Sequence, residues 1–285
     1  MKSNENSQPE AYLEALLSYL ACPIDPTSPL TALRNGAGQV VSLRSAQGEY
    51  PVIHNIPCLL PTQAQDSERN RTLWQAHQEE MWQNYQQGDP GVFANSNEVT
   101  DYIGELLDQK GDGLFLDLGC GALPQPCYMA ASEDHVHWLG IDPFFGDQQR
   151  QFPFAQAVGE YLPFRANVLD GVLYASTLSH QIDPQRSLRR VRQALKPQGR
   201  VYIWYEPPKE RIRYTLWRIK KALGIPCRYN RWHHSAFTQK SLRALLRQAG
   251  FILEEEILLC TRCPDYGTKC QEPGEFLAIA RSLPL

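Results

Sequence analysis

A short apolar run that ends in a carboxylate and two glycines constrains the fold of this chain more than any other feature. Residues 115–121 read Phe-Leu-Asp-Leu-Gly-Cys-Gly and follow a Gly-Asp-Gly turn. The apolar residues predict a buried strand with Asp117 near its carboxyl end, and Gly119 and Gly121 fall in the next turn. Open α/β sheets bind ligands just outside such strand ends, where glycine lets a ligand approach the backbone. The sequence therefore predicts a ligand site at this turn.

The residues around this turn also indicate the charge of the ligand. The dinucleotide pattern G-x-G-x-x-G places a pyrophosphate at a helix N-terminus. Here the position of the third glycine is Pro124, and Asp117 stands just upstream of the turn. A carboxylate repels phosphate and attracts a cation. The turn therefore favours a nucleoside that carries positive charge over a dinucleotide.

Residues 115–121 resemble the first motif of the class I S-adenosylmethionine-dependent methyltransferases, and later segments resemble that family in the same order. These segments are residues 138–143 (Trp-Leu-Gly-Ile-Asp-Pro, strand two), 159–164 (Gly-Glu-Tyr-Leu-Pro-Phe, beside the adenine), 169–174 (strand four) and 195–203 (the helix-turn-strand into strand five). The resemblance implies an α/β, Rossmann-like sheet of seven strands with the last one antiparallel. Residues 251–259 and 275–281 would be its closing pair.

The resemblance implies S-adenosylmethionine as the cofactor. Asp142 would hold the ribose hydroxyls, and its place 25 residues after Asp117 fits the acid expected about 20 residues past a glycine loop. An ordinary Asp-Pro turn is the alternative for Asp142. Val158 stands where the family often has an Asp for the adenine amine, so backbone or Glu160 would supply that contact. The cofactor residues implied are Asp117, Gly119, Cys120, Gly121, Asp142, Pro143, Glu160, Tyr161 and Leu162.

Three histidines are the candidate catalytic residues. Methyl transfer from a sulfonium is an in-line displacement, which needs a base only when the acceptor must lose a proton. His180 follows the fourth strand, where the family's substrate-facing residues lie, and a backbone hydrogen bond is its structural alternative. His233 and His234 precede a Thr-capped helix that resembles the approach to strand six. Lower-ranked candidates past strand five are Tyr205 and Glu206.

A tetrapeptide that is absent after the predicted fourth strand indicates the class of methyl acceptor. The Asn/Asp-Pro-Pro-Tyr tetrapeptide, which grips planar amino groups in methyltransferases of nucleobases and glutamine amides, is replaced by Ala-Ser-Thr-Leu from Ala175. We therefore predict methylation of a small molecule at oxygen or carbon. One alternative is a tRNA or protein methyltransferase that docks through a basic insert. Another is a cofactor-binding regulator without catalysis, which Leu123 in place of the family's next glycine would suit.

Residues 208–234 form this insert, with eight Lys or Arg against the single acid Glu210. A concentrated basic patch favours an anionic or lipophilic substrate. The net charge of the chain is −3, which gives no firm nucleic-acid signal. The open interpretations are a lid helix packed on the domain, which is the default, an interfacial membrane helix, and a nucleic-acid patch. One apolar helical face is predicted from Ile212, Leu216, Ile219 and Leu223.

The N-terminal part predicts a separate small α+β domain. Residues 1–10 are polar and expected to be disordered, residues 11–20 have helical periodicity, and residues 39–43 and 50–53 read as a hairpin. Residues 17–61 resemble the Trm112-like domain in their Cys-Pro start and their Tyr-Pro…Ile-Pro-x-Leu-Leu end.

The Trm112-like resemblance departs from the family at its metal ligands. Zinc-binding members begin Cys-Pro-x-Cys, whereas this chain has Cys22 and Asp25. Only Cys22, His54 and Cys58 remain as good ligands, one short of a structural zinc site. We predict a metal-free docking or lid domain over residues 11–61. A helical linker over 62–96 would join it to a methyltransferase domain over 97–285.

The cysteines and the hydropathy indicate the compartment. Eight cysteines are scattered without the density of a disulfide scaffold, which favours a reducing cytoplasm. No apolar run is long enough to span a bilayer, and the N-terminus shows no signal-peptide hydrophobic region. Cys260, Cys263 and Cys270 lack a fourth zinc ligand and are expected in a loop between strands six and seven.

Overall fold

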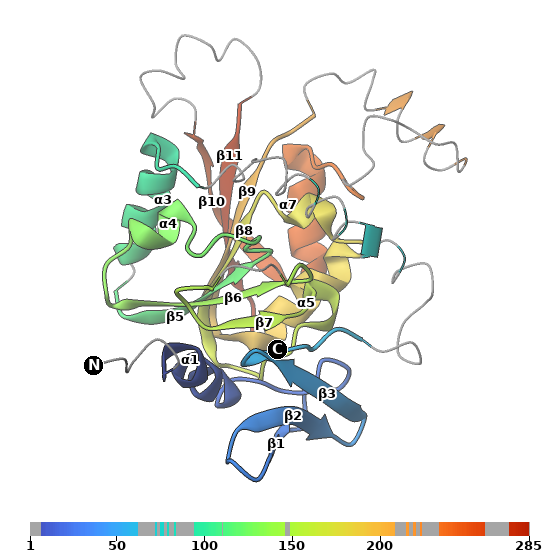
Figure 1. Ribbon diagram of the computed structural model, residues 1–285. Coiled ribbons are helices and arrows are strands. Elements are labelled where there is room, and N and C mark those ends of the chain that lie inside the picture. The colour runs from blue at the N-terminus through green and yellow to red at the C-terminus, as the bar shows by residue number, and fades with distance from the viewer. Residues whose placement is uncertain are drawn as a thin grey trace.

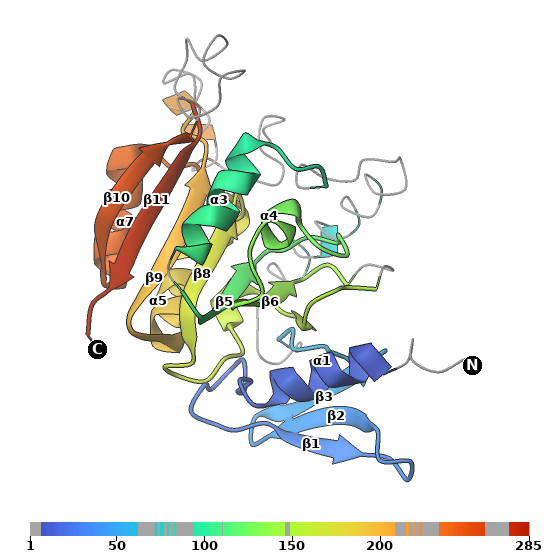
Figure 2. The same cartoon turned by 90° about the vertical axis from the view of Figure 1, so that its left-hand side faces the viewer.

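The fold is a seven-stranded mixed sheet between two layers of helices, with a small antiparallel sheet at the N-terminal end (Figures 1 and 2). The computed structural model describes residues 7–61, 94–109, 111–145, 149–208, 234–259 and 274–284, and singly residues 72, 75, 76, 79, 83, 215, 216, 219, 220 and 223. The large sheet has the order β10-β11-β9-β8-β5-β6-β7. Its strands are β5 Gly113–Leu118, β6 Val136–Asp142, β7 Phe154–Gln156, β8 Leu169–Ala175, β9 Leu195–Tyr205, β10 Phe251–Leu258 and β11 Phe276–Ser282.

Strand direction confirms the predicted fold class. β5 pairs in parallel with β6 and β8, β6 with β7, and β8 with β9, whereas β11 is antiparallel to both β9 and β10. Parallel strands place their carboxyl ends at one edge of the sheet, so the turns that follow β5, β6 and β8 lie near one another.

Helices cover both faces of this sheet (Figure 1). One face buries apolar side chains of α3 (Glu98–Asp108) and α4 (Cys127–Ala130), and the other buries those of α5 (Pro184–Ala194) and α7 (Gln239–Ala249). Two short 3-10 helices, η1 (Gly159–Tyr161) and η2 (Leu178–His180), follow β7 and β8.

The helix termini follow ordinary capping chemistry. Pro126 precedes α4 as its N-cap. Thr238 caps α7 in a reciprocal pair with Ser241. Asn97 is the N-cap of α3. The Asn97 side chain accepts from the Thr100 amide at 3.1 Å, while the Ser96 hydroxyl bonds Asp101.

The N-terminal part contains α1 (Ser7–Leu17) and an antiparallel sheet of β1 (Thr31–Arg34), β2 (Val40–Ser45), β3 (Gly48–Ile53) and β4 (Ile56–Pro57). The predicted hairpin is β2–β3, and β1 and β4 extend it on either side. The expectation of disorder over residues 1–10 is wrong for residues 7–10, which belong to α1. Pro9 is tolerated in a first turn, Glu10 suits the positive end of the helix dipole, and the buried Leu13 anchors the helix.

Cys22 and His54, two of the three residues of this part that could ligate zinc by type, lie in different surroundings. The buried Cys22 thiol accepts from the Ser45 hydroxyl at 3.2 Å and lies 3.6 Å from the Tyr50 hydroxyl. His54 is exposed in the β3–β4 turn, at φ 51°. Within the described part of the chain, no three His, Cys, Asp or Glu side chains are placed to hold a metal ion.

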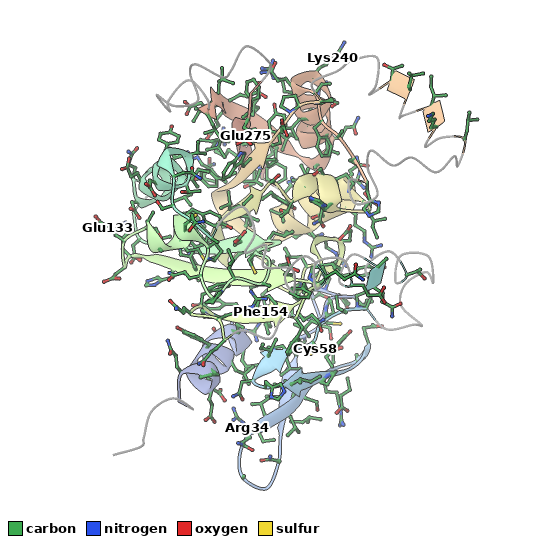
Figure 3. The ribbon with its side chains drawn as sticks, turned by 45° about the horizontal axis from the view of Figure 1, so that its top comes forward. Arg34, Cys58, Glu133, Phe154, Lys240 and Glu275 are labelled. Carbon is green, nitrogen blue, oxygen red and sulfur yellow. The ribbon has the colours of Figure 1, made fainter. Side chains whose placement is uncertain are left out.

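This N-terminal part shares one hydrophobic core with the large sheet. Leu20 pairs with Phe164 in an isolated bridge, and both belong to the apolar cluster that also contains Leu139 and Ile141 of β6. The Leu59 amide donates to the carbonyl oxygen of Gln156 at 2.7 Å, which continues the pairing beyond the edge strand β7. Figure 3 labels Cys58 and Phe154 at this junction. The edge of the sheet is thereby covered, which protects its unpaired backbone groups.

The connection from β6 to β7 is unusually short for parallel strands. Its described residues, 143–145 and 149–153, contain no helix, although such crossovers usually include one. α1 contacts β7, so the N-terminal part lies against the strand that this connection leaves without a helix of its own.

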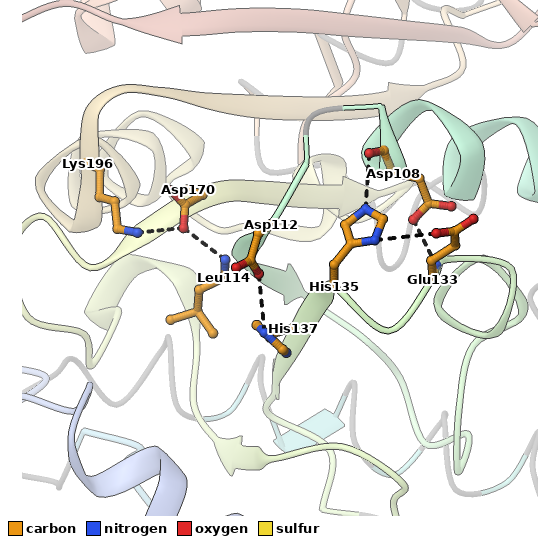
Figure 4. A network of polar contacts seen from close by, with 8 residues as sticks. All are labelled: Asp108, Asp112, Leu114, Glu133, His135, His137, Asp170 and Lys196. Atoms are coloured by element: carbon orange, nitrogen blue, oxygen red, sulfur yellow. Dashed lines mark hydrogen bonds and ion pairs between the residues drawn. The ribbon is translucent and has the colours of Figure 1, made fainter.

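The amino ends of the parallel strands carry a polar network (Figure 4). Asp170 of β8 accepts from the Leu114 amide at 2.9 Å and from Lys196 Nζ at 2.7 Å. His137 and Asp112 approach to 3.4 Å at the same edge. This edge is opposite to the predicted ligand turn. Among the described helices, none has the length and hydropathy required to cross a membrane.

Replacing Leu20 by alanine tests the shared core. Leu20 is fully buried, so we expect Leu20→Ala to lower the free energy of unfolding by about 2–5 kcal/mol. Urea denaturation followed by far-UV circular dichroism and tryptophan fluorescence should show one common transition that moves as a unit, because Trp138 and Trp204 lie in the large sheet.

Val41→Ala is the matched control for this experiment. Val41 is 44% exposed, and its truncation should change the free energy of unfolding by no more than about 0.5 kcal/mol. Two separated transitions, with the fluorescence transition unmoved by Leu20→Ala, would contradict the shared core.

Candidate functional site

The turn after β5 is held against the end of β6. The amides of Gly119 and Cys120 donate to the carbonyl oxygen of Ile141 at 2.8 and 3.2 Å. Gly119 has φ +87°, and a Cβ there would come within 2.6 Å of Thr177. Gly121 has φ +67°, and a Cβ there would meet no heavy atom within 4 Å. Gly119 is therefore required by the neighbouring turn, whereas Gly121 borders open space that can take a ligand.

Asp117 lies below this turn and is completely buried. The Tyr128 hydroxyl of α4 donates to Asp117 Oδ2 at 2.6 Å, and none of the described residues donates to Oδ1. Burial raises the pKa of the Asp117 carboxyl to about 7, and the Asp142 carboxylate adds to the rise, against the opposing effects of Tyr128 and Arg150. The free oxygen is therefore suited to a partner that carries positive charge or a donor hydrogen.

Asp142 at the end of β6 joins two turns. Its Oδ2 accepts from the Gly121 amide at 3.0 Å, and its Oδ1 accepts from the Phe144 amide at 2.7 Å. An ionised carboxylate has about four acceptor positions and binds hydroxyl donors as well as amides. Pro143, between them, uses its carbonyl oxygen to accept from Gln156 Nε2 at 2.9 Å.

Arg150, which the sequence analysis missed, completes this arrangement. It is buried, and its Nη1 donates to the carbonyl oxygen of Gly121 at 2.6 Å. Its guanidinium carbon lies 3.7 Å from the centroid of the Phe154 ring. A lone cation between aromatic residues was the available signal in the sequence, since charged side chains are seldom fully buried without partners.

The segment predicted to border the adenine uses its side chains for contacts within the protein. Glu160 is buried, and its Oε1 accepts from the amides of Ile182 at 2.7 Å and Asp183 at 3.2 Å, just before α5. Burial raises the pKa of the Glu160 carboxyl to about 7. The Tyr161 ring lies 4.0 Å below the Arg186 guanidinium, and Leu162 is in the core. The Glu160 carboxylate therefore positions the turn before α5.

The buried Cys120 completes the set of predicted cofactor residues. It is 5% exposed, and burial holds the pKa of its thiol well above the usual range. The thiol is therefore no nucleophile at neutral pH, and Cys120 contributes its backbone to the turn.

The histidine-bearing segments meet beyond the ends of β5 and β8. The Ser235 amide donates to the carbonyl oxygen of Ser179 at 3.0 Å, which brings the segment that contains His234 beside η2 and His180. The Thr177 hydroxyl donates to the Leu118 carbonyl at 2.6 Å and ties η2 to the end of β5. His233 lies outside the described residues.

The lower-ranked candidates are less well placed. The Tyr205 hydroxyl donates to Glu256 Oε1 at 2.5 Å, and burial and this carboxylate raise the pKa of Tyr205. Glu206 is exposed. Tyr205 therefore holds β10 rather than offering a free hydroxyl.

The basic insert departs from the default expectation of a packed lid. Three members of its predicted apolar face are described, and they are 52%, 50% and 68% exposed at Leu216, Ile219 and Leu223. The short described pieces of the insert lie away from the sheet (Figure 1, orange). Their apolar surface is therefore not buried on the domain. Ile212, the three cysteines at 260, 263 and 270, and most of the expected linker over 62–96 lie outside the described residues.

Titration of Asp117 should make the stability of the protein depend on pH. A carboxyl whose pKa is about 7 when folded and 3.8 ordinarily keeps its proton in the folded state, so its contribution is full below about pH 4 and is lost as pH rises through 7. We expect urea unfolding between pH 5 and 8 to show a falling free energy of unfolding, by up to about 1.4 kcal/mol per pH unit for each such proton.

Two neutral variants separate the contributions to this slope. Asp117→Asn should remove the contribution of Asp117 to the pH dependence of the free energy of unfolding. The contribution of Glu160 should remain in this variant, because the pKa of Glu160 is also raised to about 7. Glu160→Gln should remove that second contribution. An Asp117→Asn profile parallel to that of the unmodified protein would show that Asp117 is ionised throughout.

Comparison with known proteins gives the family. The model of the methyltransferase domain family matches residues 93–256, more than half of the chain. No curated protein sequence matches this chain. A solved structure of Burkholderia thailandensis 1,6-didemethyltoxoflavin-N1-methyltransferase, with bound 1,6-didemethyltoxoflavin and S-adenosylhomocysteine, is 16% identical with a TM-score of 0.55, covering 84% of this chain and 97% of that one.

A solved structure of the [4+2]-cyclase SpnF has a similar degree of structural similarity to this chain. It is 18% identical with a TM-score of 0.52, covering 80% of this chain and 98% of the cyclase chain. At these identities the two solved structures show a common fold, and the family match shows the membership. The chain therefore belongs to the methyltransferase domain family.

Proposed function

We propose that this chain transfers the methyl group of S-adenosylmethionine to a small-molecule acceptor, at oxygen or carbon. The observation that carries the proposal is the turn between Asp117 and Asp142. It offers a buried carboxylate oxygen to which none of the described residues donates, beside a glycine at which an added Cβ would meet nothing within 4 Å.

The residues at this turn suit the cofactor. S-adenosylmethionine supplies an electrophilic methyl group on a positively charged sulfur. Asp117 and Asp142 give the site negative charge, which favours a cationic ligand. Gly119, Cys120 and Gly121 would contribute backbone, and Asp142 and Pro143 would lie at the ribose. The segment from Glu160 to Leu162 would border the adenine through its backbone, since its side chains are engaged elsewhere.

A small acceptor is supported by the first of the two similar structures, whose name gives a small heterocycle as its substrate. The exposed apolar side chains of the insert and its excess of basic residues support an acceptor that is lipophilic or anionic. A macromolecular acceptor remains the second candidate, because the same basic insert could dock tRNA or protein. Affinity for tRNA that falls steeply with salt would favour it.

We also propose that residues 11–61 are a metal-free Trm112-like domain that serves as part of the scaffold of the methyltransferase. The Cys-Pro start at Cys22, the antiparallel sheet, and the core shared with β6 and β7 support this assignment. A cytoplasmic location is supported by Cys22, Cys58, Cys120 and Cys127, which are free thiols.

Calorimetric titration with S-adenosylmethionine tests the cofactor site. We expect saturable binding by the unmodified protein and a loss of at least about tenfold in affinity for Asp117→Ala and for Asp142→Ala, since each removes a buried acceptor. Asp170→Ala is the matched control, because it removes an acidic network at the opposite edge of the sheet (Figure 4) and should leave affinity unchanged. Failure of the unmodified protein to bind would overturn the proposal.

Substitution of the histidines tests the role of a general base. With an acceptor found by screening hydroxyl and carbon acids for transfer of a labelled methyl group, loss of the base should lower kcat by about 10²–10⁴-fold. The affected variant is expected among His180→Ala, His233→Ala and His234→Ala, with unchanged affinity for the cofactor. His135→Ala, at the opposite edge, is the control. Cofactor binding by the unmodified protein without transfer to any acceptor would favour a regulator.

A further inference from the structure

Arg150 has an arrangement that the proposed function leaves unexplained. It is 6% exposed and is the one Lys or Arg that is buried among the described residues. Burying a charge is costly unless the group is paired and hydrogen-bonded. The partners of Arg150 therefore indicate what the buried charge stabilises.

Its partners are carbonyl oxygens of two turns. Nη1 donates to Gly121 at 2.6 Å and to Leu123 at 3.4 Å, both in the turn after β5. Nη2 donates to Phe144 at 3.4 Å and to Phe145 at 3.3 Å, both in the turn after β6. One guanidinium thus joins the two turns that border the proposed cofactor site.

Asp142 and Arg150 hold the same two residues from opposite sides. The amides of Gly121 and Phe144 donate to the Asp142 carboxylate, and the carbonyl oxygens of Gly121 and Phe144 accept from Arg150. The backbone N–H and the backbone C=O of Gly121 and of Phe144 are therefore all hydrogen-bonded, which fixes the backbone of both residues. A planar guanidinium can serve two carbonyl positions at once, which a lysine ammonium on a flexible stem does poorly.

The short β6–β7 connection explains why this link is needed. Its described residues contain no helix that would order the turn after β6. Phe154 of the next strand lies against the guanidinium at 3.7 Å and Phe152 at 5.9 Å, which fixes the plane of the group. Without Arg150, the carbonyl oxygens at Gly121 and Phe144 would lose these donors inside the protein.

Arg150 also contributes charge to the site. Its positive charge opposes the rise in the pKa of Asp117. The other groups that act on Asp117 are the Tyr128 hydroxyl of α4, the Asp142 carboxylate of β6 and the Cys120 thiol of the turn. When Asp117 is ionised, two carboxylates and one guanidinium leave the site with net negative charge, which suits a cationic ligand.

We propose that Arg150 is a positioning residue that fixes the turns after β5 and β6 in their cofactor-binding geometry. This inference rests on the proposed function. The guanidinium acts through the backbone of Gly121 and Phe144, and it keeps the Asp117 carboxylate available to a cationic cofactor.

The test is calorimetric titration with S-adenosylmethionine between pH 5.5 and 8.5. Affinity of the unmodified protein should rise with pH through about 7, because the cofactor favours the ionised form of Asp117. Arg150→Gln should weaken binding at least about tenfold and move the midpoint of this profile to higher pH, since the positive neighbour of Asp117 is lost. Arg150→Lys keeps the charge without the planar fork, so its midpoint should stay near the original while its affinity remains low.

Arg190→Gln is the matched control. Arg190 also donates to backbone carbonyl oxygen, at 2.9 Å to Ile24, but it joins the N-terminal part to α5 away from the site. This variant should lose stability without a change in cofactor affinity or in the pH profile.

The outcomes separate this inference from the proposed function. If the unmodified protein does not bind the cofactor, the proposed function fails. If it binds and Arg150→Lys binds equally well, the positioning role is wrong. An Arg150→Gln variant that binds with the unmodified pH profile would overturn the electrostatic part. If Arg150→Gln does not fold, Arg150→Lys with the Arg190→Gln control still decides the positioning role.

Discussion

The parallel pairing of β5 with β6 is the constraint on which the rest of the site depends. It sets Leu118 opposite Ile141, so the two strands end together and their turns can exchange hydrogen bonds. The carbonyl oxygen of Ile141 then receives the amides of Gly119 and Cys120. A slip of one strand by one residue relative to the other would put Asp117 and Asp142 on different faces of the sheet, because side chains alternate along a strand. The register of β5 against β6 therefore determines which side chains can meet at the site.

The parts of this arrangement that were predictable from the sequence are the local ones. Apolar runs followed by glycine or by Asp-Pro indicate where parallel strands end, and they identified Asp117 and Asp142. Tyr128 and Arg150 were not found, because each meets the turn through a fold-level contact that no short spacing encodes. Glu160 was found by resemblance and is placed differently, since the amides before α5 claim its carboxylate. The position of the N-terminal part also depends on long-range packing, which local periodicity cannot indicate.

Membership of the family does not identify the methyl acceptor, because proteins with the same sheet differ in the reaction they support. One of the two similar structures is a methyltransferase by name and the other a cyclase, so the same sheet supports different reactions. In this chain the turn after β8 and the segment around His234 carry the candidate catalytic residues His180 and His234. These two segments meet beyond the carboxyl ends of β5 and β8, whereas Asp117 and Asp142 belong to β5 and β6 themselves. The candidate catalytic segments are therefore separate elements from the strands that carry the two acids.

The bridge between Leu20 and Phe164 has a consequence for synthesis of the chain. Leu13, Leu16 and Leu20 leave the ribosome early, yet the residues that cover them near Phe164 are made about 140 residues later. At typical elongation rates of about 5–20 residues per second, this apolar surface waits roughly seven to thirty seconds for its partner. The nascent N-terminal part is thus a site for chaperone engagement during translation, and codon changes that slow elongation before residue 164 should lower the yield of folded protein.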